Sequence, residues 1–160
     1  MGYHQLDELD EKILQMVIAN ARIPFLEVAR VCNVSGAAIH QRVQKLINLG
    51  ILKGSEFTVD HSKVGYETVA YMGLYLKNPE QFGEVVAALK DIPEVVECHY
   101  TTGQYDLFIK LFAKNNEHLL DIIHTKLQPL GLARTETIIS FQEVFRRPVP
   151  IFFDFCETHL

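Results

Sequence analysis

The sequence lacks a long hydrophobic run and has few of the residues that hold metals or form disulfides. No apolar stretch approaches the roughly eighteen residues of a membrane-spanning helix, and no charged-then-apolar signal begins the chain, so we expect a soluble cytoplasmic protein. The three cysteines, Cys32, Cys98 and Cys156, are odd in number and widely separated, which suits a reducing compartment and gives no metal-ligand spacing. Among the seven scattered histidines, His118 and His124 do not share a helix face. We therefore expect neither a metal site nor a cofactor.

Basic charge is also scarce, because 15 Lys and Arg face 20 Asp and Glu, for a net charge of −5. This balance argues against a protein that simply coats nucleic acid. The positive charge is nevertheless concentrated, since residues 22–53 contain Glu27 as their one acidic residue against the bases Arg22, Arg30, Arg42, Lys45 and Lys53. So few cations would bind DNA weakly, because phosphate contacts supply much of the affinity. We expect two or more such DNA-binding heads per particle.

Residues 25–52 predict two short helices separated by a tight turn, the arrangement that presents a helix to the major groove of DNA. Pro24 suits the start of the first helix, which we expect over 25–32. In the turn, Asn33 tolerates a left-handed backbone and Ser35 can cap the following helix. The core-facing candidates of the first helix are Leu26, Val28 and Ala29.

The second helix, expected over 36–49 and ended by Gly50, should have one buried stripe and one outer side. The stripe consists of Ile39, Val43, Leu46 and Ile47. On the outer side, small residues allow close approach to DNA, Gln can pair with adenine, and Arg or Lys can bind guanine or phosphate. An ordinary solvated face is the alternative, but the preceding helix, turn and cap favour recognition. The predicted DNA-binding residues are Ser35, Ala37, His40, Gln41, Arg42, Gln44 and Lys45.

A further helix is predicted before this pair, from Asp7 to about Asn20, with a capping box formed by Asp7 and Asp10. Its inner face should carry Leu9, Ile13, Met16 and Val17. After Gly50, residues 51–59 predict a short strand, and the polar residues that follow predict a linker. We therefore expect a DNA-binding domain over 1–64 and a second domain over 65–160.

The second domain alternates strand and helix patterns in the order βαββαβ, which predicts a ferredoxin-like α+β fold with two helices on one face of an antiparallel sheet. The expected strands are 68–77, 95–101, 105–113 and 135–145, and the expected helices are 79–91 and 115–128. Both sheet faces are apolar, so the face without helices needs another cover. We expect the sheet of an identical subunit there. The alternative cover is the apolar tail 151–153.

Several segments form a combination that is specific as a whole, namely LDELDEKIL, NARI, VSGAAIHQRVQKLINLGIL, GSEFTVD, TGQYD and TET. With the βαββαβ order they resemble the leucine-responsive regulator/AsnC (Lrp/AsnC) family of transcription regulators, from Leu6 to about Phe145. The resemblance implies a winged helix-turn-helix head and an ACT-like (RAM) effector-sensing domain. It also implies homodimers that close into tetramers or octamers and bind amino acids or related metabolites between subunits. The expected partners are therefore double-stranded DNA and a small-molecule effector. Residues 140–160 depart from the family's usual ending.

The chemistry of the loop after the second strand agrees with an amino-acid effector. Backbone N–H groups around Gly103 can approach a carboxylate closely, and Asp106 can accept from an ammonium group. The alternative is that Gly103 only serves a turn that Asp106 ties by hydrogen bonds. The loop candidates are Thr102, Gly103, Gln104 and Asp106, and the walls carried over by position are Tyr100, Tyr105, Thr135 and Thr137.

Two other classes of function stay open alongside the regulator. Two-domain chains of this kind also occur among sirohaem decarboxylases, and His99, on the second strand near the loop, is the one well-placed histidine for such chemistry. A metabolite-binding module that has lost DNA binding is the other alternative, but the well-capped, basic second helix argues against it. We therefore expect a regulator and not an enzyme.

Overall fold

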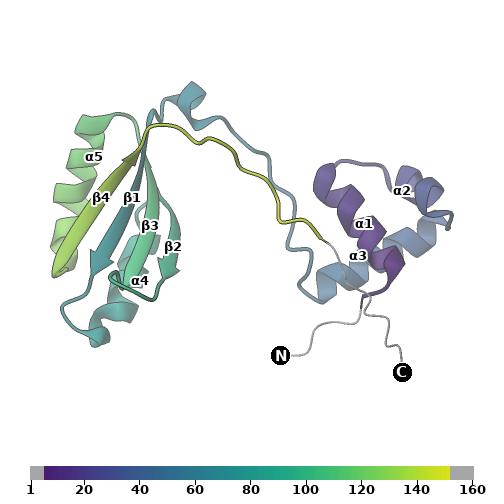
Figure 1. Cartoon of the computed structure of the whole chain (residues 1–160), viewed down its shortest axis with the longest axis horizontal. Coiled ribbons are helices and arrows are strands. Elements are labelled where there is room, and N and C mark those ends of the chain that lie inside the picture. The colour runs from purple at the N-terminus through teal and green to yellow at the C-terminus, as the bar shows by residue number, and fades with distance from the viewer. Residues whose placement is uncertain (1–5, 152–160) are drawn as a thin grey trace. The chain divides into compact units, whose positions relative to one another are not determined.

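The computed structural model describes residues 6–151, which belong to two units (Figure 1). Of the described residues, one unit contains 6–57 together with 146–151, and the other is Thr58–Phe145. The predicted boundary at 64 differs because the 3-10 turn His61–Val64 belongs to the second unit, where the His61 ring stacks on Phe112 with centroids 4.1 Å apart. Within the described residues, no helix is long and apolar enough to cross a membrane.

The first unit contains the expected three helices, α1 (Glu8–Ala19), α2 (Phe25–Cys32) and α3 (Gly36–Asn48). The capping box of α1 is present, since Asp10 N donates to Asp7 Oδ1 (2.9 Å) and Asp7 N donates to Asp10 Oδ2 (3.3 Å). Asn33 turns the chain with a left-handed φ of 55°, and Ser35 Oγ caps α3 by accepting from Ala38 N (3.1 Å). The core of the unit consists of Ile13, Leu14, Val28, Ala29, Ile39, Val43 and Leu46.

Two residues that were expected to face this core are exposed. Leu26 is 74% exposed and Ile47 is 47% exposed. At 100° per residue, Leu26 lies roughly 110° around α2 from the middle of the buried pair Val28 and Ala29. Ile47 lies about 80° from Ile39 around α3, at the margin of the stripe. The inward prediction was therefore wrong for both residues, because each falls outside the arc that its neighbours cover.

The strand predicted over 51–59 is absent from the described chain. Ile51 N and Leu52 N donate to Leu46 O of α3, and no residue of 51–59 joins a strand ladder, which a strand requires. The predicted wing therefore has no strand among the described residues.

The segment before residue 152 lies against α1. Ile151 packs on the core of the first unit, and its carbonyl oxygen accepts a hydrogen bond from Gln15 Nε2 (3.2 Å). Ile151 is the first residue of the tail 151–153, the alternative cover for the sheet, and it packs on the first unit instead. Phe152 and Phe153 lie outside the described residues.

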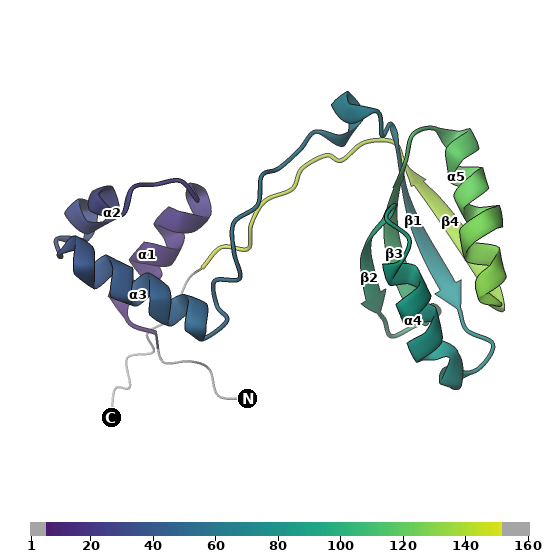
Figure 2. The same ribbon diagram turned by 180° about the vertical axis from the view of Figure 1, so that it is seen from behind.

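The second unit has the predicted βαββαβ order (Figures 1 and 2). Its sheet order is β2-β3-β1-β4 with every pair antiparallel, as a ferredoxin-like α+β fold requires. Helix α5 continues through a π-helical turn, Ile123–Leu127, and a 3-10 turn, Gln128–Leu130. The elements are β1 (Thr68–Tyr75), α4 (Phe82–Lys90), β2 (Val95–Tyr100), β3 (Leu107–Ala113), α5 (Asn116–Ile122) and β4 (Arg134–Ser140).

Strand β4 ends at Ser140, although the sequence predicted a strand up to Phe145. Ser140 pairs with Val69, near the beginning of β1, so β1 offers almost no further residue for β4 to pair with. The next apolar residues, Phe141 and Val144, are exposed. The end of β1 therefore sets the end of β4.

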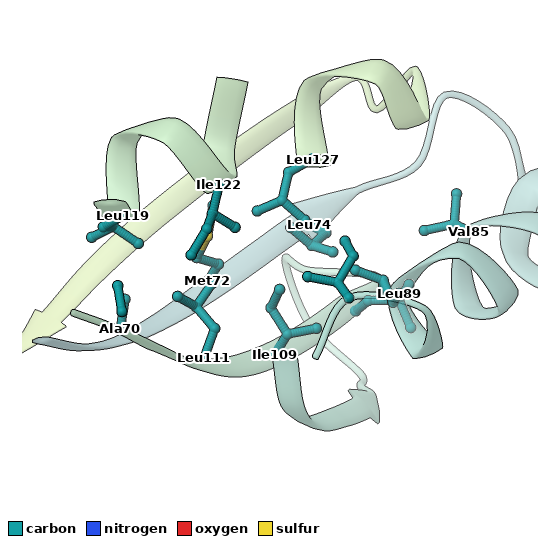
Figure 3. Packing of buried hydrophobic residues seen from close by; sticks show 13 residues of the cluster. Ala70, Met72, Leu74, Val85, Leu89, Ile109, Leu111, Leu119, Ile122 and Leu127 are labelled. Carbon is teal, nitrogen blue, oxygen red and sulfur yellow. The ribbon is translucent and has the colours of Figure 1, made fainter. Parts of the chain in front are cut away.

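Both helices cover the same face of the sheet, where alternate strand residues form the core (Figure 3). Ala70, Met72 and Leu74 of β1 point toward Leu119, Ile122 and Leu127 of the α5 region, and β3 contributes Ile109 and Leu111. As predicted, two helices cover one face of the sheet and leave the other face without a helix.

The other face of the sheet, here called the open face, has aromatic residues that no helix of this unit covers. Tyr71 stacks on Phe108 with ring centroids 5.9 Å apart. Lys110 lies near the rings of Tyr71 and Phe112, with its Nζ atom 5.7 and 5.5 Å from their centroids. The ring of Tyr105 lies over Gly73, where a Cβ atom would collide with it.

Gly73 should therefore resist substitution. Gly73→Ala places a methyl group into the Tyr105 ring, and overpacking of this kind costs about 1–3 kcal/mol. The matched control is Gly83→Ala in α4, where a Cβ meets nothing within 4 Å and helix propensity predicts a gain of up to about 1 kcal/mol. Denaturant unfolding followed by circular dichroism at one protein concentration measures both. Equal stability of the two variants would contradict the close approach of Tyr105.

Candidate DNA and effector sites

Helix α3 presents an uncharged strip of side chains to solvent, here called the α3 strip. Its members are exposed and recur at three- or four-residue spacing, which places them on one side of the helix. Gln44 Nε2 donates to Asn48 Oδ1 (2.9 Å), and the His40 ring lies edge-on to Phe25. Amide groups on a helix that follows a tight turn are suited to base edges. The strip consists of Ala37, His40, Gln41, Gln44 and Asn48.

The two predicted cations of α3 do not belong to this strip, because both contact the beginning of α1. Arg42 Nη1 donates to Asp7 Oδ2 (2.5 Å) and to Asp10 Oδ1 (3.1 Å). Lys45 Nζ donates to the other oxygen of the same carboxylate, Asp10 Oδ2 (2.8 Å). The Arg42 guanidinium lowers the pKa of Asp7, and the same bond raises the pKa of Arg42. Both cations are therefore paired within the unit.

Ser35, another of the predicted DNA-binding residues, caps α3 with its side-chain oxygen. Two residues of this candidate site were not predicted from the sequence, Asn48 of the strip and Asp10 beside it. The spacing of four from Gln44 could have indicated Asn48. Asp10 could not have been found in this way, because Arg42 and Lys45, which donate to it, lie 32 and 35 residues away along the chain.

The loop between β2 and β3 is tied to the end of β1. Asp106 Oδ2 accepts from Leu76 N (2.8 Å), and Asp106 N donates to Leu74 O (3.0 Å). Within the loop, Thr101 Oγ1 donates to Tyr105 O (2.9 Å). Gly103 adopts a left-handed φ of 98°, and Thr102, Gly103 and Gln104 are exposed. Asp106 thus fastens the loop to a neighbouring strand, and the backbone around Gly103 stays accessible.

The predicted walls of the effector site lie on opposite faces of the sheet. Tyr105 lies over the open face, at Gly73. Thr135 and Thr137 pair with Leu74 and Met72, so their side chains share the helix-covered face with those residues. Tyr100 is also opposite a core residue, Leu107. A single chain therefore does not bring the predicted set together.

A polar group that the sequence did not predict lies on the open face where the edge strand β4 pairs with the end of β1. Glu136 of β4 accepts hydrogen bonds from Tyr105 Oη (2.8 Å) and Tyr75 Oη (3.3 Å), and it pairs with Arg134. The Arg134 guanidinium also lies 4.6 Å from the centroid of the Tyr75 ring. The register of β1 and β4 creates this group, and register is not legible in the sequence of β4 alone.

A cavity of about 390 Å³ opens between α4 and the edge strand β2. Its lining is mostly apolar and includes Phe82 and Tyr100, whose rings meet edge-on with centroids 4.9 Å apart. Cys98 also lines it, and burial raises the pKa of this thiol. His99 points to the other side of β2, where Nε2 lies 3.5 Å from Glu97 Oε2. Tyr100 is the one predicted effector residue in this lining.

Both parts of the chain match parts of known regulators. Residues 6–47 match the AsnC-type helix-turn-helix domain, and residues 69–150 match the Lrp/AsnC ligand binding domain. The chain is 37% identical to the regulatory protein AsnC of Haemophilus influenzae over 147 residues, covering 91% of this chain and 98% of that protein. It is 33% identical to AsnC of Escherichia coli over 150 residues, covering 93% and 99%.

Solved structures agree with this assignment. The structure of E. coli AsnC superposes with a TM-score of 0.88 and 32% identity, covering 92% of this chain and all of that one. The Neisseria meningitidis regulator NMB0573 in complex with L-Met has a TM-score of 0.84 at 20% identity, covering 89% and 94%, and shows the shared fold. The chain therefore belongs to the Lrp/AsnC family of transcription regulators and combines a DNA-binding helix-turn-helix head with a ligand-binding domain.

Proposed function

We propose that this cytoplasmic regulator binds operator DNA as a homo-oligomer, with α3 of each head in the major groove. The main support for this proposal is the α3 strip. Its exposed amides and its small residue, Ala37, lie on the second helix of a capped helix-turn-helix. Gln41 and Gln44 are the base-reading residues in this proposal, with Ala37 allowing close approach. Ser35 contributes by capping α3, and His40 is the member of the strip that follows Ala37.

The proposed assembly begins with a dimer through the open face. Aromatic rings gather there without a helix to cover them, and such a patch marks an interaction surface. The open face carries charges of both signs, because Lys110 pairs with Glu97 and Arg134 pairs with Glu136. It can therefore pack against the same face of a second subunit related by a two-fold axis. Dimers would then associate into tetramers or octamers.

The proposed effector is an amino acid or a related small metabolite bound between subunits. A loop with accessible backbone N–H groups at Gly103 can bind a carboxylate, and Asp106 lies at the end of the same loop. Because Tyr105 and Thr135 occupy opposite faces of one sheet, a site that uses both needs a second subunit. The ligand-binding domain match and the L-Met complex of the Neisseria regulator support this class of ligand.

A gel-shift assay tests the proposed function. DNA from the protein's own promoter region is titrated at several salt concentrations, with and without each amino acid, against a duplex of scrambled sequence. We expect a shift at lower protein concentration on the promoter DNA, and a change in that concentration with one or a few amino acids. Equal affinity for both duplexes under every condition would overturn DNA recognition. If no amino acid changes the affinity for the promoter DNA, only the proposal of an amino-acid effector is overturned.

A further inference from the structure

Four charged side chains form a cluster between the beginning of α1 and the middle of α3. Asp10 is its centre, because this carboxylate is 0% exposed and accepts from both Arg42 Nη1 (3.1 Å) and Lys45 Nζ (2.8 Å). Asp7 binds Arg42 from the solvent side. The cluster contains two carboxylates and two cations, so its formal charge is zero.

The position of this cluster matters for DNA binding because its cations flank the α3 strip. Lys45 lies one turn after Gln41, about 40° away around the helix, and Arg42 lies about 60° beyond Lys45 on the same side. Their side chains remain 32% (Arg42) and 41% (Lys45) exposed. A cation strengthens binding to any DNA sequence by replacing counterions at a phosphate. Arg42 and Lys45 are already neutralised by carboxylates, so each must give up an ion pair before it can do so.

We propose that Asp7 and Asp10 mask the two cations of α3 from DNA phosphates, which lowers the affinity of the head for arbitrary DNA and leaves discrimination to the α3 strip. The inference rests on the proposed DNA-binding function. In this role Asp7 and Asp10 limit the sequence-independent part of DNA binding although they contact no DNA. They act through Arg42 and Lys45.

Helix capping does not explain the charge of these residues. Asn caps a helix about as well as Asp, and an amide oxygen can also return the bond of a capping box. Replacing a buried ion pair by apolar residues is often neutral or stabilising, so such a pair is weak evidence of a purely stabilising role. What the carboxylates provide beyond the cap is the neutralisation of Arg42 and Lys45.

The test compares Asp7→Asn and Asp10→Asn with Glu8→Gln in the full-length protein. Each change removes one negative charge near the beginning of α1, but among the described residues Glu8 makes no ion pair. Binding to a scrambled duplex is measured by fluorescence anisotropy between 50 and 300 mM salt, on the order of the range over which phosphate contacts dominate. We expect the slope of log affinity against log salt to steepen by about 0.9 per head for each aspartate variant, as one more phosphate contact requires. Glu8→Gln should leave it near the wild-type value.

One double variant separates masking from a structural role. Asp7→Asn combined with Arg42→Gln restores a neutral cluster, so the added slope should disappear. Circular dichroism verifies folding, and the half-exposed Asp7 keeps the test available if Asp10→Asn does not fold. Unchanged or shallower slopes in folded aspartate variants, or an equal change in Glu8→Gln, would overturn masking. If wild-type protein fails to prefer promoter DNA, the proposed function fails instead.

Discussion

Replacing both Tyr71 and Phe108 by glutamate should convert the protein into monomers and weaken operator binding by about 10²–10⁴-fold, the usual contribution of a second linked binding event. The two rings stack on each other on the open face, where both are half-buried. Each variant subunit would bury two carboxylates in a two-fold interface whose nearby cation, Lys110, already lies 3.7 Å from Glu97 Oε1, and this is strongly unfavourable. Light scattering after size-exclusion chromatography measures the mass, and anisotropy measures affinity for operator DNA.

The expected loss of operator affinity is large because a single head binds DNA weakly. Its α3 strip has no charge, and the cations beside it are paired with Asp7 and Asp10. A monomer therefore has few phosphate contacts to hold it on DNA, whereas a dimer places a second head near its half-site at a high effective concentration. Affinity for the small-molecule effector should fall as well if its site needs two subunits.

The control is Leu120→Glu on α5, which adds one glutamate at an exposed leucine on the helix-covered side of the sheet. This variant should keep the wild-type mass and operator affinity. A double variant of Tyr71 and Phe108 that folds, stays oligomeric and binds operator normally would show that the open face is not the interface.

The sequence predicted the fold well because its local signals agree with the packing. Pro24 marks the start of α2, Asn33 and Ser35 mark the turn that follows it, and the structure places each of them there. In the second unit, alternation along β1 and β3 correctly separates the core face from the aromatic face. Where elements end was less predictable, since the end of β4 depends on where its partner strand begins.

The candidate site was harder to predict because it depends on contacts between distant residues. Arg42 and Lys45 look like free cations in the sequence, and only the fold places Asp10 between them. In the same way, the sequence predicted Tyr105 and Thr135 in one site. The structure places the Tyr105 ring over Gly73 on the open face, and the pairing of Thr135 with Leu74 places Thr135 on the opposite face. Residue type and helical spacing predict which side chains are outward, but not which of them are already paired.

Replacing Gln41 and Gln44 by alanine should remove most of the sequence preference of the head. A bidentate contact between an amide and adenine contributes about 1–3 kcal/mol of discrimination, so each change should weaken operator binding by about 5- to 150-fold per head. Both side chains are neutral, so affinity for a scrambled duplex and its salt slope should stay near the wild-type values. Anisotropy titrations on operator and scrambled duplexes measure both quantities.

This result would differ in kind from that of the aspartate variants. The glutamine variants lower the ratio of operator to scrambled affinity by weakening operator binding, whereas Asp7→Asn strengthens binding to the scrambled duplex and steepens its salt dependence. Gln128→Ala, an exposed glutamine of the second unit, is the control and should change neither affinity. If the glutamine variants lose equal affinity for both duplexes, Gln41 and Gln44 contact the DNA backbone, and base reading belongs to other residues of α3.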